Sequence, residues 1–252
     1  MSTFQHSVYL DPEKCKGCIN CIKHCPTGAI RVRGRKAHII KEFCIDCGEC
    51  VRVCPHHAKK TRYDGLETLQ NYAYTVALPA PSFYAQFNNI TDTNIILSAL
   101  LKLGFNDVLE VAAAAEIVSE LSRQYIANHP NGKPFISTAC PSVTRLIRVR
   151  FPALLERLLP ILPPVELAAR VAARRAMQKT GLKREEIGIF FISPCPAKVT
   201  YVQDPLCIEK SEIDRVLAVK KVYTALLPLM NADDAEKDLK IAGKIGISWG
   251  YS

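Results

Sequence analysis

The sequence lacks the features that would export the chain or anchor it in a membrane. Its first ten residues, MSTFQHSVYL, contain no basic stretch followed by an apolar one, as a secretory signal would. The longest apolar runs, such as residues 153–165, are interrupted by charges and prolines. We therefore expect neither a signal peptide nor a membrane span.

Low-complexity sequence is also scarce, and 48% of the residues are apolar, which is typical of a globular protein with a proper core. Eleven cysteines are present without an export signal. Disulfide frameworks belong to oxidising compartments, so this count favours metal ligation under reducing conditions. We expect the protein to be cytoplasmic.

The formal net charge is +9, but this value omits the cysteines, which become thiolates when they bind a metal. A basic surface near such sites could dock an acidic redox partner, or it could simply be a solvated charged face. We expect no nucleic-acid partner. Basic residues crowd the start of the chain at Lys14, Lys16, Lys23, Arg31, Arg33, Arg35, Lys36, Arg52, Lys59, Lys60 and Arg62.

Eight of the cysteines form an internal duplication. The pattern C-x2-C-x2-C-x3-C-P occurs twice, and every spacing of the first copy recurs 29 residues later. This run is the pattern of bacterial ferredoxins, in which three closely spaced cysteines bind one 4Fe-4S cluster and the fourth binds the neighbouring cluster. Cross-ligation assigns Cys15, Cys18, Cys21 and Cys54 to cluster 1, and Cys25, Cys44, Cys47 and Cys50 to cluster 2.

Glycine and proline support the same interpretation. Gly17 and Gly48 would let the tight loops approach the sulfides without a Cβ, and Pro26 and Pro55 would turn the chain aside after each last cysteine. Residues 29–40 alternate apolar and basic side chains and predict a short hairpin. A pair of zinc sites is the alternative, since C-x2-C also binds zinc, but two sets of four cysteines, each followed by proline, favour the clusters.

From Tyr72 the cysteine-dense loops give way to apolar strands and amphipathic helices, which indicate an α/β domain with a mostly parallel sheet. We therefore predict an α+β, ferredoxin-like dicluster domain over residues 1–65 and an α/β domain over residues 66–252, with the boundary near residues 63–71. The predicted strands are 74–78, 107–111, 134–137, 187–192, 215–219 and 244–248. The predicted helices are 94–103, 113–128, 142–159, 165–180 and 222–231.

Two further cysteine motifs follow predicted strands: Ser137-Thr138-Ala139-Cys140-Pro141 and Ser193-Pro194-Cys195-Pro196-Ala197-Lys198. Ligands gather beyond the carboxyl ends of strands in such sheets. The first motif opens a predicted helix, whose N–H groups favour an anion, and the second places Lys198 three residues after its cysteine. Each cysteine taken alone is more often an inert buried thiol.

Taken together, these two motifs resemble the first two signature motifs of the FeFe-hydrogenase catalytic domain, T-S-C-C-P and P-C-x-x-K, which follow a dicluster ferredoxin domain in many members. The resemblance implies that Cys140 and Cys195 bind the cubane of an H-cluster, a 4Fe-4S cluster with an attached di-iron unit. It also implies that Lys198 is a catalytic-site residue that contacts a diatomic ligand of the di-iron unit.

Three positions depart from the family pattern. Ala139 stands in place of a proton-relaying cysteine, Ser193 in place of a methionine, and Tyr201 in place of a glutamate of the proton path. Alanine cannot transfer a proton. These departures resemble the sensory subgroup, in which slow hydrogen chemistry serves detection and a signalling domain can follow.

The family's third motif, C-x3-C, is not present after Cys195, where Cys207 is the one remaining cysteine and is interpreted as a structural thiol. We therefore expect the chain to be a fragment that completes an H-cluster only as part of a longer chain. The favoured hypothesis is an iron-sulfur, hydrogenase-like oxidoreductase that exchanges electrons with a redox partner such as a ferredoxin or reductase, or with a signalling domain. The alternative is a ferredoxin-like electron carrier or iron-sulfur scaffold without hydrogenase activity.

Overall fold

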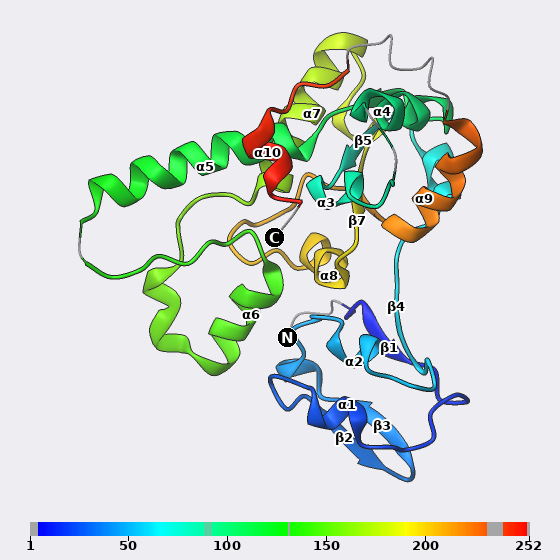
Figure 1. The fold of residues 1–252 in the computed structure, drawn as a ribbon, viewed down its shortest axis with the longest axis vertical. Coiled ribbons are helices and arrows are strands. Elements are labelled where there is room, and N and C mark those ends of the chain that lie inside the picture. The colour runs from blue at the N-terminus through cyan, green and yellow to red at the C-terminus, as the bar shows by residue number, and fades with distance from the viewer. Residues whose placement is uncertain (1–4, 89, 91, 131, 231–238, 251–252) are drawn as a thin grey trace. The chain divides into compact units, whose positions relative to one another are not determined.

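The computed structural model describes residues 5–88, 90, 92–130, 132–230 and 239–250 of the chain (Figure 1). Contacts divide the chain into two compact units. The first unit comprises Met1–Tyr63 together with two later segments, Pro134–Leu159 and Cys195–Lys210. The second comprises Asp64–Lys133, Pro160–Pro194 and Ser211–Ser252. The segments that carry Cys140 and Cys195 thus belong to the same unit as the duplicated cysteine motif.

The cysteine-rich part of the first unit contains two small antiparallel sheets. Strand β1 (Val8–Leu10) pairs with β4 (Lys59–Thr61), and β2 (Ile30–Arg33) pairs with β3 (Lys36–Ile39). The second pair is the predicted hairpin, which is confirmed. Its turn residues, Gly34 and Arg35, have φ values of 54° and 58°, the left-handed conformations that a two-residue hairpin turn with the native twist requires.

Each repeat also contains one short helix, α1 (Asn20–Lys23) in the first and α2 (Glu49–Arg52) in the second. A positive-φ glycine precedes each helix, Gly17 at 75° and Gly48 at 80°. A Cβ on Gly17 would lie 2.6 Å from the carbonyl oxygen of Arg35, and one on Gly48 would lie 3.0 Å from Cγ of Pro196. Both loops therefore need glycine for their backbone conformation and for the close approach of neighbouring residues.

The later segments of the first unit form α6 (Pro141–Arg150), η3 (Pro152–Arg157) and α8 (Pro196–Gln203). Two predictions here are wrong. Residues 134–137 form no strand and contribute a single bridge between Ile136 and Leu158. The helix predicted over 142–159 ends at Arg150, because Phe151 precedes a proline and cannot easily keep helical angles.

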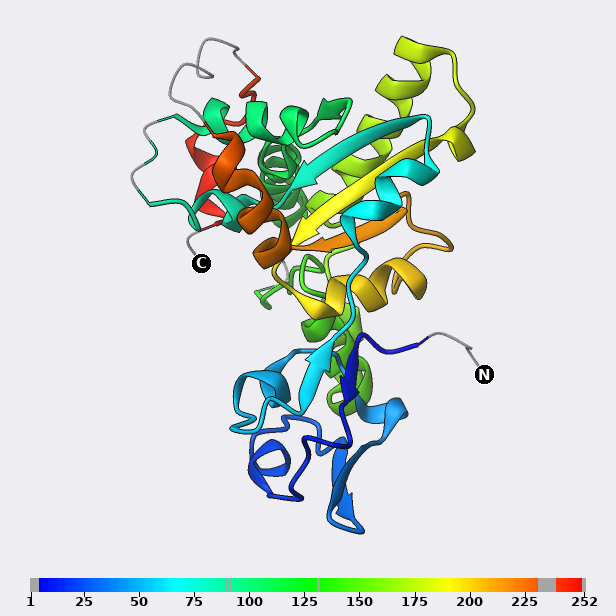
Figure 2. The same ribbon diagram turned by 90° about the vertical axis from the view of Figure 1, so that its right-hand side faces the viewer.

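The second unit is built on a four-stranded, entirely parallel sheet, and the predicted fold class is confirmed (Figure 2). The strand order is β6-β5-β7-β8. Every residue of β7 is buried, as expected for a parallel strand that is covered on both faces. The strands are β5 (Tyr74–Pro79), β6 (Asp107–Val108), β7 (Ile187–Ser193) and β8 (Arg215–Ala218).

Helices cover this sheet and bury its apolar side chains. The aromatic core lies around Phe190, whose ring makes edge contacts with Tyr72 and Phe105 at centroid distances of 5.6 and 5.7 Å. None of the helices in the described part of the chain is both long and apolar enough to cross a bilayer. The helices of this unit are α3 (Pro81–Tyr84), α4 (Thr93–Lys102), α5 (Val111–Asn128), α7 (Pro164–Thr180), α9 (Val219–Leu226) and α10 (Lys244–Ser248).

Several predicted boundaries shift where a helix begins early. The predicted strands 107–111 and 215–219 stop at Val108 and Ala218, because α5 begins at Val111 and α9 at Val219. The helix predicted over 222–231 instead spans α9 and the turn η5 (Leu227–Leu229), and its last residue lies outside the described residues.

The strand predicted over 244–248 is wrong, since these residues form α10. Gly246 explains the error. Its N–H donates to Oε1 of Glu116 at 3.1 Å, and a Cβ at this position would come within 2.2 Å of the carbonyl oxygen of Ala112. Apolar and small residues alternate in this segment because its small residue, Gly246, lets α10 pack closely against α5, and not because the segment is a strand.

Candidate iron-sulfur centres

Two cavities in the first unit are each lined by four cysteines. One cavity also contains Val8, Ile30 and Ile45 in its wall, and the other Leu10, Ala37 and Lys59. In both, the fourth cysteine of one repeat lies with the three closely spaced cysteines of the other. The sets are Cys25, Cys44, Cys47 and Cys50 in the first cavity and Cys15, Cys18, Cys21 and Cys54 in the second.

The fourth cysteine of each repeat receives an equivalent hydrogen bond. The N–H of Ala29 donates to Sγ of Cys25 at 3.2 Å, and the N–H of Ala58 donates to Sγ of Cys54 at 3.3 Å. Burial alone would raise the pKa of the Cys54 thiol, but nearby backbone N–H groups, including that of Ala58, outweigh burial and lower this pKa. These donors favour a thiolate, the form that binds iron.

Other thiols in the cavities are held in their neutral form by burial. Burial raises the pKa of Cys44 to about 12, with a further contribution from the Asp46 carboxylate, and also raises that of Cys50 to about 12. Several such thiols cannot ionise together without a cation among them, whereas iron replaces their protons on binding. The donor set therefore fits a metal cluster better than it fits an empty cavity.

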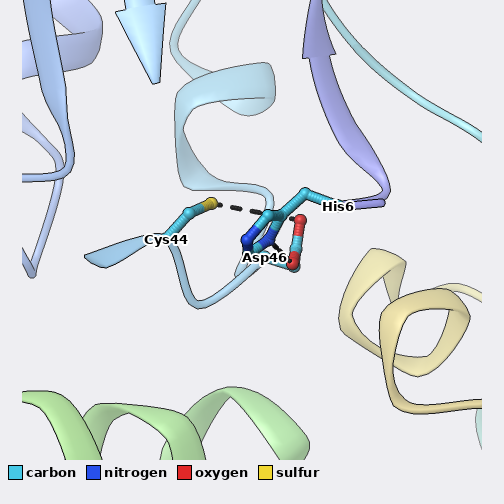
Figure 3. A group of neighbouring side chains, drawn as sticks. All are labelled: His6, Cys44 and Asp46. Carbon is cyan, nitrogen blue, oxygen red and sulfur yellow. Dashed lines mark hydrogen bonds and ion pairs between the residues drawn. The ribbon is translucent and has the colours of Figure 1, made fainter. Parts of the chain in front are cut away.

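A buried network that the sequence analysis did not identify fixes the second cysteine loop (Figure 3). Nδ1 of His6 lies 2.5 Å from Oδ2 of Asp46, and Oδ1 of Asp46 lies 4.0 Å from Sγ of Cys44. The same carboxylate accepts from the Ser7 hydroxyl at 3.2 Å and from the Val8 N–H at 3.1 Å. These bonds join strand β1 to the loop that carries Cys44 and Cys47.

The network keeps Asp46 charged in spite of its burial. Burial would raise the pKa of this carboxyl, but hydrogen bonds and the nearby His6 ring hold it below its usual value. Asp46 lies between Cys44 and Cys47, inside the cysteine motif. The spacing of that motif predicts the cysteine ligands and gives no reason to expect a structural role for the residue between them. No signal in the sequence identifies His6, which lies forty residues away.

The structure brings together the two hydrogenase-like motifs. Cys140 is the N-cap residue of α6 and Cys195 the N-cap residue of α8, and a proline follows each at the first helical position. Nζ of Lys198 donates to the carbonyl oxygen of Ala139 at 2.7 Å, so the lysine of one motif bonds to the backbone of the other. Burial raises the pKa of Cys195, and the Cys140 thiol adds to this increase.

The second cysteine loop packs directly against both motif helices. The Ser142 hydroxyl on α6 donates to the carbonyl oxygen of Ile45 at 3.1 Å. On α8, Pro196 lies against Gly48, and Oγ1 of Thr200 accepts from the N–H of Ser7 at 3.1 Å. The cavity lined by Cys25, Cys44, Cys47 and Cys50 is thus the one whose loop adjoins the Cys140 and Cys195 motifs.

Two thiolates are half of what a cubane needs. Cys140 is exposed and Cys195 is half-buried, while Cys207, the remaining cysteine, is exposed in the segment after α8. Ser193 and Tyr201 are both buried. The eight duplicated cysteines fit two 4Fe-4S clusters, whereas Cys140 and Cys195 alone are two ligands short of a third.

Comparisons with known proteins identify the same two parts. Residues 7–55 match the 4Fe-4S dicluster domain, and residues 73–234 match the family described as iron only hydrogenase large subunit, C-terminal domain. No protein of curated function matches the sequence.

Solved structures with a similar fold include a variant of the FeFe-hydrogenase HydA1 from Chlamydomonas reinhardtii, with 18% identity and a TM-score of 0.50 over 69% of this chain and 47% of that one. HydA(deltaEFG), whose structure is described as revealing stepwise H-cluster assembly, has 18% identity and a TM-score of 0.51 over 69% and 46% of the two chains. At this identity the likeness shows the fold, and the chain spans about half the length of these proteins. The matched domains show that the chain belongs to the iron-only hydrogenase large-subunit family and that a 4Fe-4S dicluster domain precedes its hydrogenase-type domain.

Proposed function

We propose that the chain transfers electrons through two 4Fe-4S clusters to or from an FeFe-hydrogenase-like site at Cys140 and Cys195. The observation that carries the proposal is the grouping of eight cysteines around two cavities, one of which adjoins both motif helices. Cluster 2 (Cys25, Cys44, Cys47 and Cys50) is then the inner centre. Cluster 1 (Cys15, Cys18, Cys21 and Cys54) is the outer centre, which exchanges electrons with a redox partner.

The hydrogen chemistry that we propose is slow and serves detection. Ala139 offers only a backbone carbonyl, which Lys198 already occupies, and an alanine side chain relays no proton. The buried Tyr201 replaces a carboxylate of the family's proton path, and its ring lies 5.5 Å from the Lys198 ammonium. A downstream signalling domain or a ferredoxin- or reductase-like protein in the cytoplasm would receive the electrons.

The test uses a longer version of the chain with a C-x3-C motif, expressed with cluster maturation enzymes. Carbonyl and cyanide infrared bands from the di-iron unit are expected, and they should disappear in Cys195→Ala. Absence of these bands from the longer, fully loaded protein would refute the hydrogenase-like assignment.

A second function is an electron carrier or iron-sulfur scaffold without hydrogenase activity. It is favoured by the two motif cysteines, which are too few for a cubane. Iron counting separates the two: about eight irons per chain fits two clusters alone, and appreciably more requires a third centre.

A further inference from the structure

The second repeat buries a lysine where the first repeat has an isoleucine. With the offset of the duplication, Lys59 is the counterpart of Ile30, as Ala58 is the counterpart of Ala29. Ile30 is 2% exposed and Lys59 is 3% exposed. Burial suits isoleucine, but a lysine is almost never fully buried unless its charge is compensated.

No protein group in the described part of the chain compensates this charge. Nζ of Lys59 is inaccessible to solvent and has no hydrogen-bond partner there. The next residue shows the usual alternative, since Lys60 is part-exposed and its Nζ lies 2.7 Å from Oδ2 of Asp11. The orphan ammonium of Lys59 therefore indicates an anion that occupies the adjacent space.

That space is a cysteine-lined cavity. Lys59 contributes to the wall of the cavity formed by Cys15, Cys18, Cys21 and Cys54. Its positive charge also opposes the effect of burial on three thiols, Cys21 and Cys54 of this set and Cys50 of the other. The ammonium thus lies where it can act on both clusters.

A 4Fe-4S cluster with four thiolate ligands is net anionic and becomes more so on reduction. A buried positive charge favours the reduced form, because it offsets the added electron in a medium of low dielectric constant. We propose that the Lys59 ammonium is the buried counter-charge of the two clusters and raises both of their reduction potentials.

The direction of electron flow that follows from this buried charge rests on the proposed function. Raised potentials make the two clusters better acceptors, so electrons released at a hydrogen-oxidising site would flow outward to the partner. Ile30, the counterpart in the first repeat, brings no charge to the other cavity.

The experiment is a redox titration, monitored by electron paramagnetic resonance, of the reconstituted full chain and its variants. Lys59→Met removes the buried charge and keeps an unbranched side chain, Lys59→Arg keeps the charge, and Lys60→Met removes a charge from the neighbouring surface position. In Lys59→Met both midpoint potentials should fall. For each cluster, the ratio of reduced to oxidised form at a fixed potential should change about tenfold, or about 59 mV for one electron.

Lys60→Met and Lys59→Arg should keep the parent potentials to well within that shift. Equal potentials in Lys59→Met and Lys60→Met would overturn the proposal. Should Lys59→Met bind fewer irons than Lys60→Met, recovery of the irons in Lys59→Arg would support a charge role, and failure to recover them would overturn it. The titration requires neither hydrogen nor an H-cluster, so its outcome is independent of whether the hydrogenase-like assignment holds.

Discussion

Replacing Asp46 by asparagine should selectively weaken the inner cluster. The side chain of Asp46 is fully buried and accepts bonds from His6, Ser7 and Val8. Breaking a buried, hydrogen-bonded ionic pair costs about 3–5 kcal/mol, and asparagine keeps one acceptor oxygen but brings donors that face other donors. We expect a loss of about 3 kcal/mol in the free energy that holds the 44–50 loop closed.

The assay is the rate at which cluster absorbance is lost to an iron chelator in mild denaturant. When local opening limits access, about 3 kcal/mol corresponds to a roughly hundredfold faster loss. About four irons should leave quickly and the remainder at the parent rate. The matched control is Asp11→Asn, which breaks a part-exposed pair with Lys60 and should leave both rates unchanged.

A uniform acceleration of both phases in Asp46→Asn would show that the network stabilises the whole unit and does not specifically hold one loop. Parent-like kinetics in both phases would refute the reasoning, because the buried carboxylate would then contribute nothing to cluster retention.

Three other perturbations test the remaining parts of the structure. Phe190→Ala should destabilise the parallel sheet by about 3–5 kcal/mol, measured by denaturant unfolding, because it leaves a cavity at a fully buried ring. The Tyr84 hydroxyl donates to Glu110 at 2.8 Å, and burial raises the pKa of Tyr84 well above 10. The protonated Tyr84 hydroxyl therefore makes its full contribution to the free energy of unfolding below pH 10, and this contribution is lost as the pH rises above that value. Tyr84→Phe should flatten the alkaline part of a stability-against-pH profile. Cys25→Ala should disturb the cluster of Cys44, Cys47 and Cys50 and leave in the magnetic resonance spectrum the signal of one isolated cluster, whereas loss of the cluster of its own repeat would contradict cross-ligation.

The cysteine spacing carried the most information that the sequence could give. The duplicated C-x2-C-x2-C-x3-C-P run resembles that of bacterial ferredoxins, in which the fourth cysteine binds the neighbouring cluster. This resemblance predicted that Cys25 groups with the second repeat and Cys54 with the first, as the two cavities have them. The strands β5 and β7 were also predicted from the sequence, because a short continuous apolar run in an α/β domain is typical of a parallel strand that is buried on both faces.

Long-range contacts explain what the sequence could not predict. Residues 244–248 have a strand-like pattern, but Gly246 packs closely against α5 as part of a helix. Residues 134–137 are partly apolar, but among the described residues they make only the isolated bridge between Ile136 and Leu158. The partner of Asp46 is His6, and no local pattern connects two residues forty positions apart. Lys59 was visible as one of many basic residues near the clusters, but only its burial distinguishes it from the solvated ones.

The most direct test of the account is the metal content of the purified, reconstituted chain, measured together with its magnetic resonance spectrum after reduction. Eight thiolates around two cavities predict about eight irons and a matching amount of acid-labile sulfide per chain, with paramagnetic signals from two interacting 4Fe-4S clusters. A chain that binds zinc in their place, or that gives no paramagnetic signal on reduction, would contradict it.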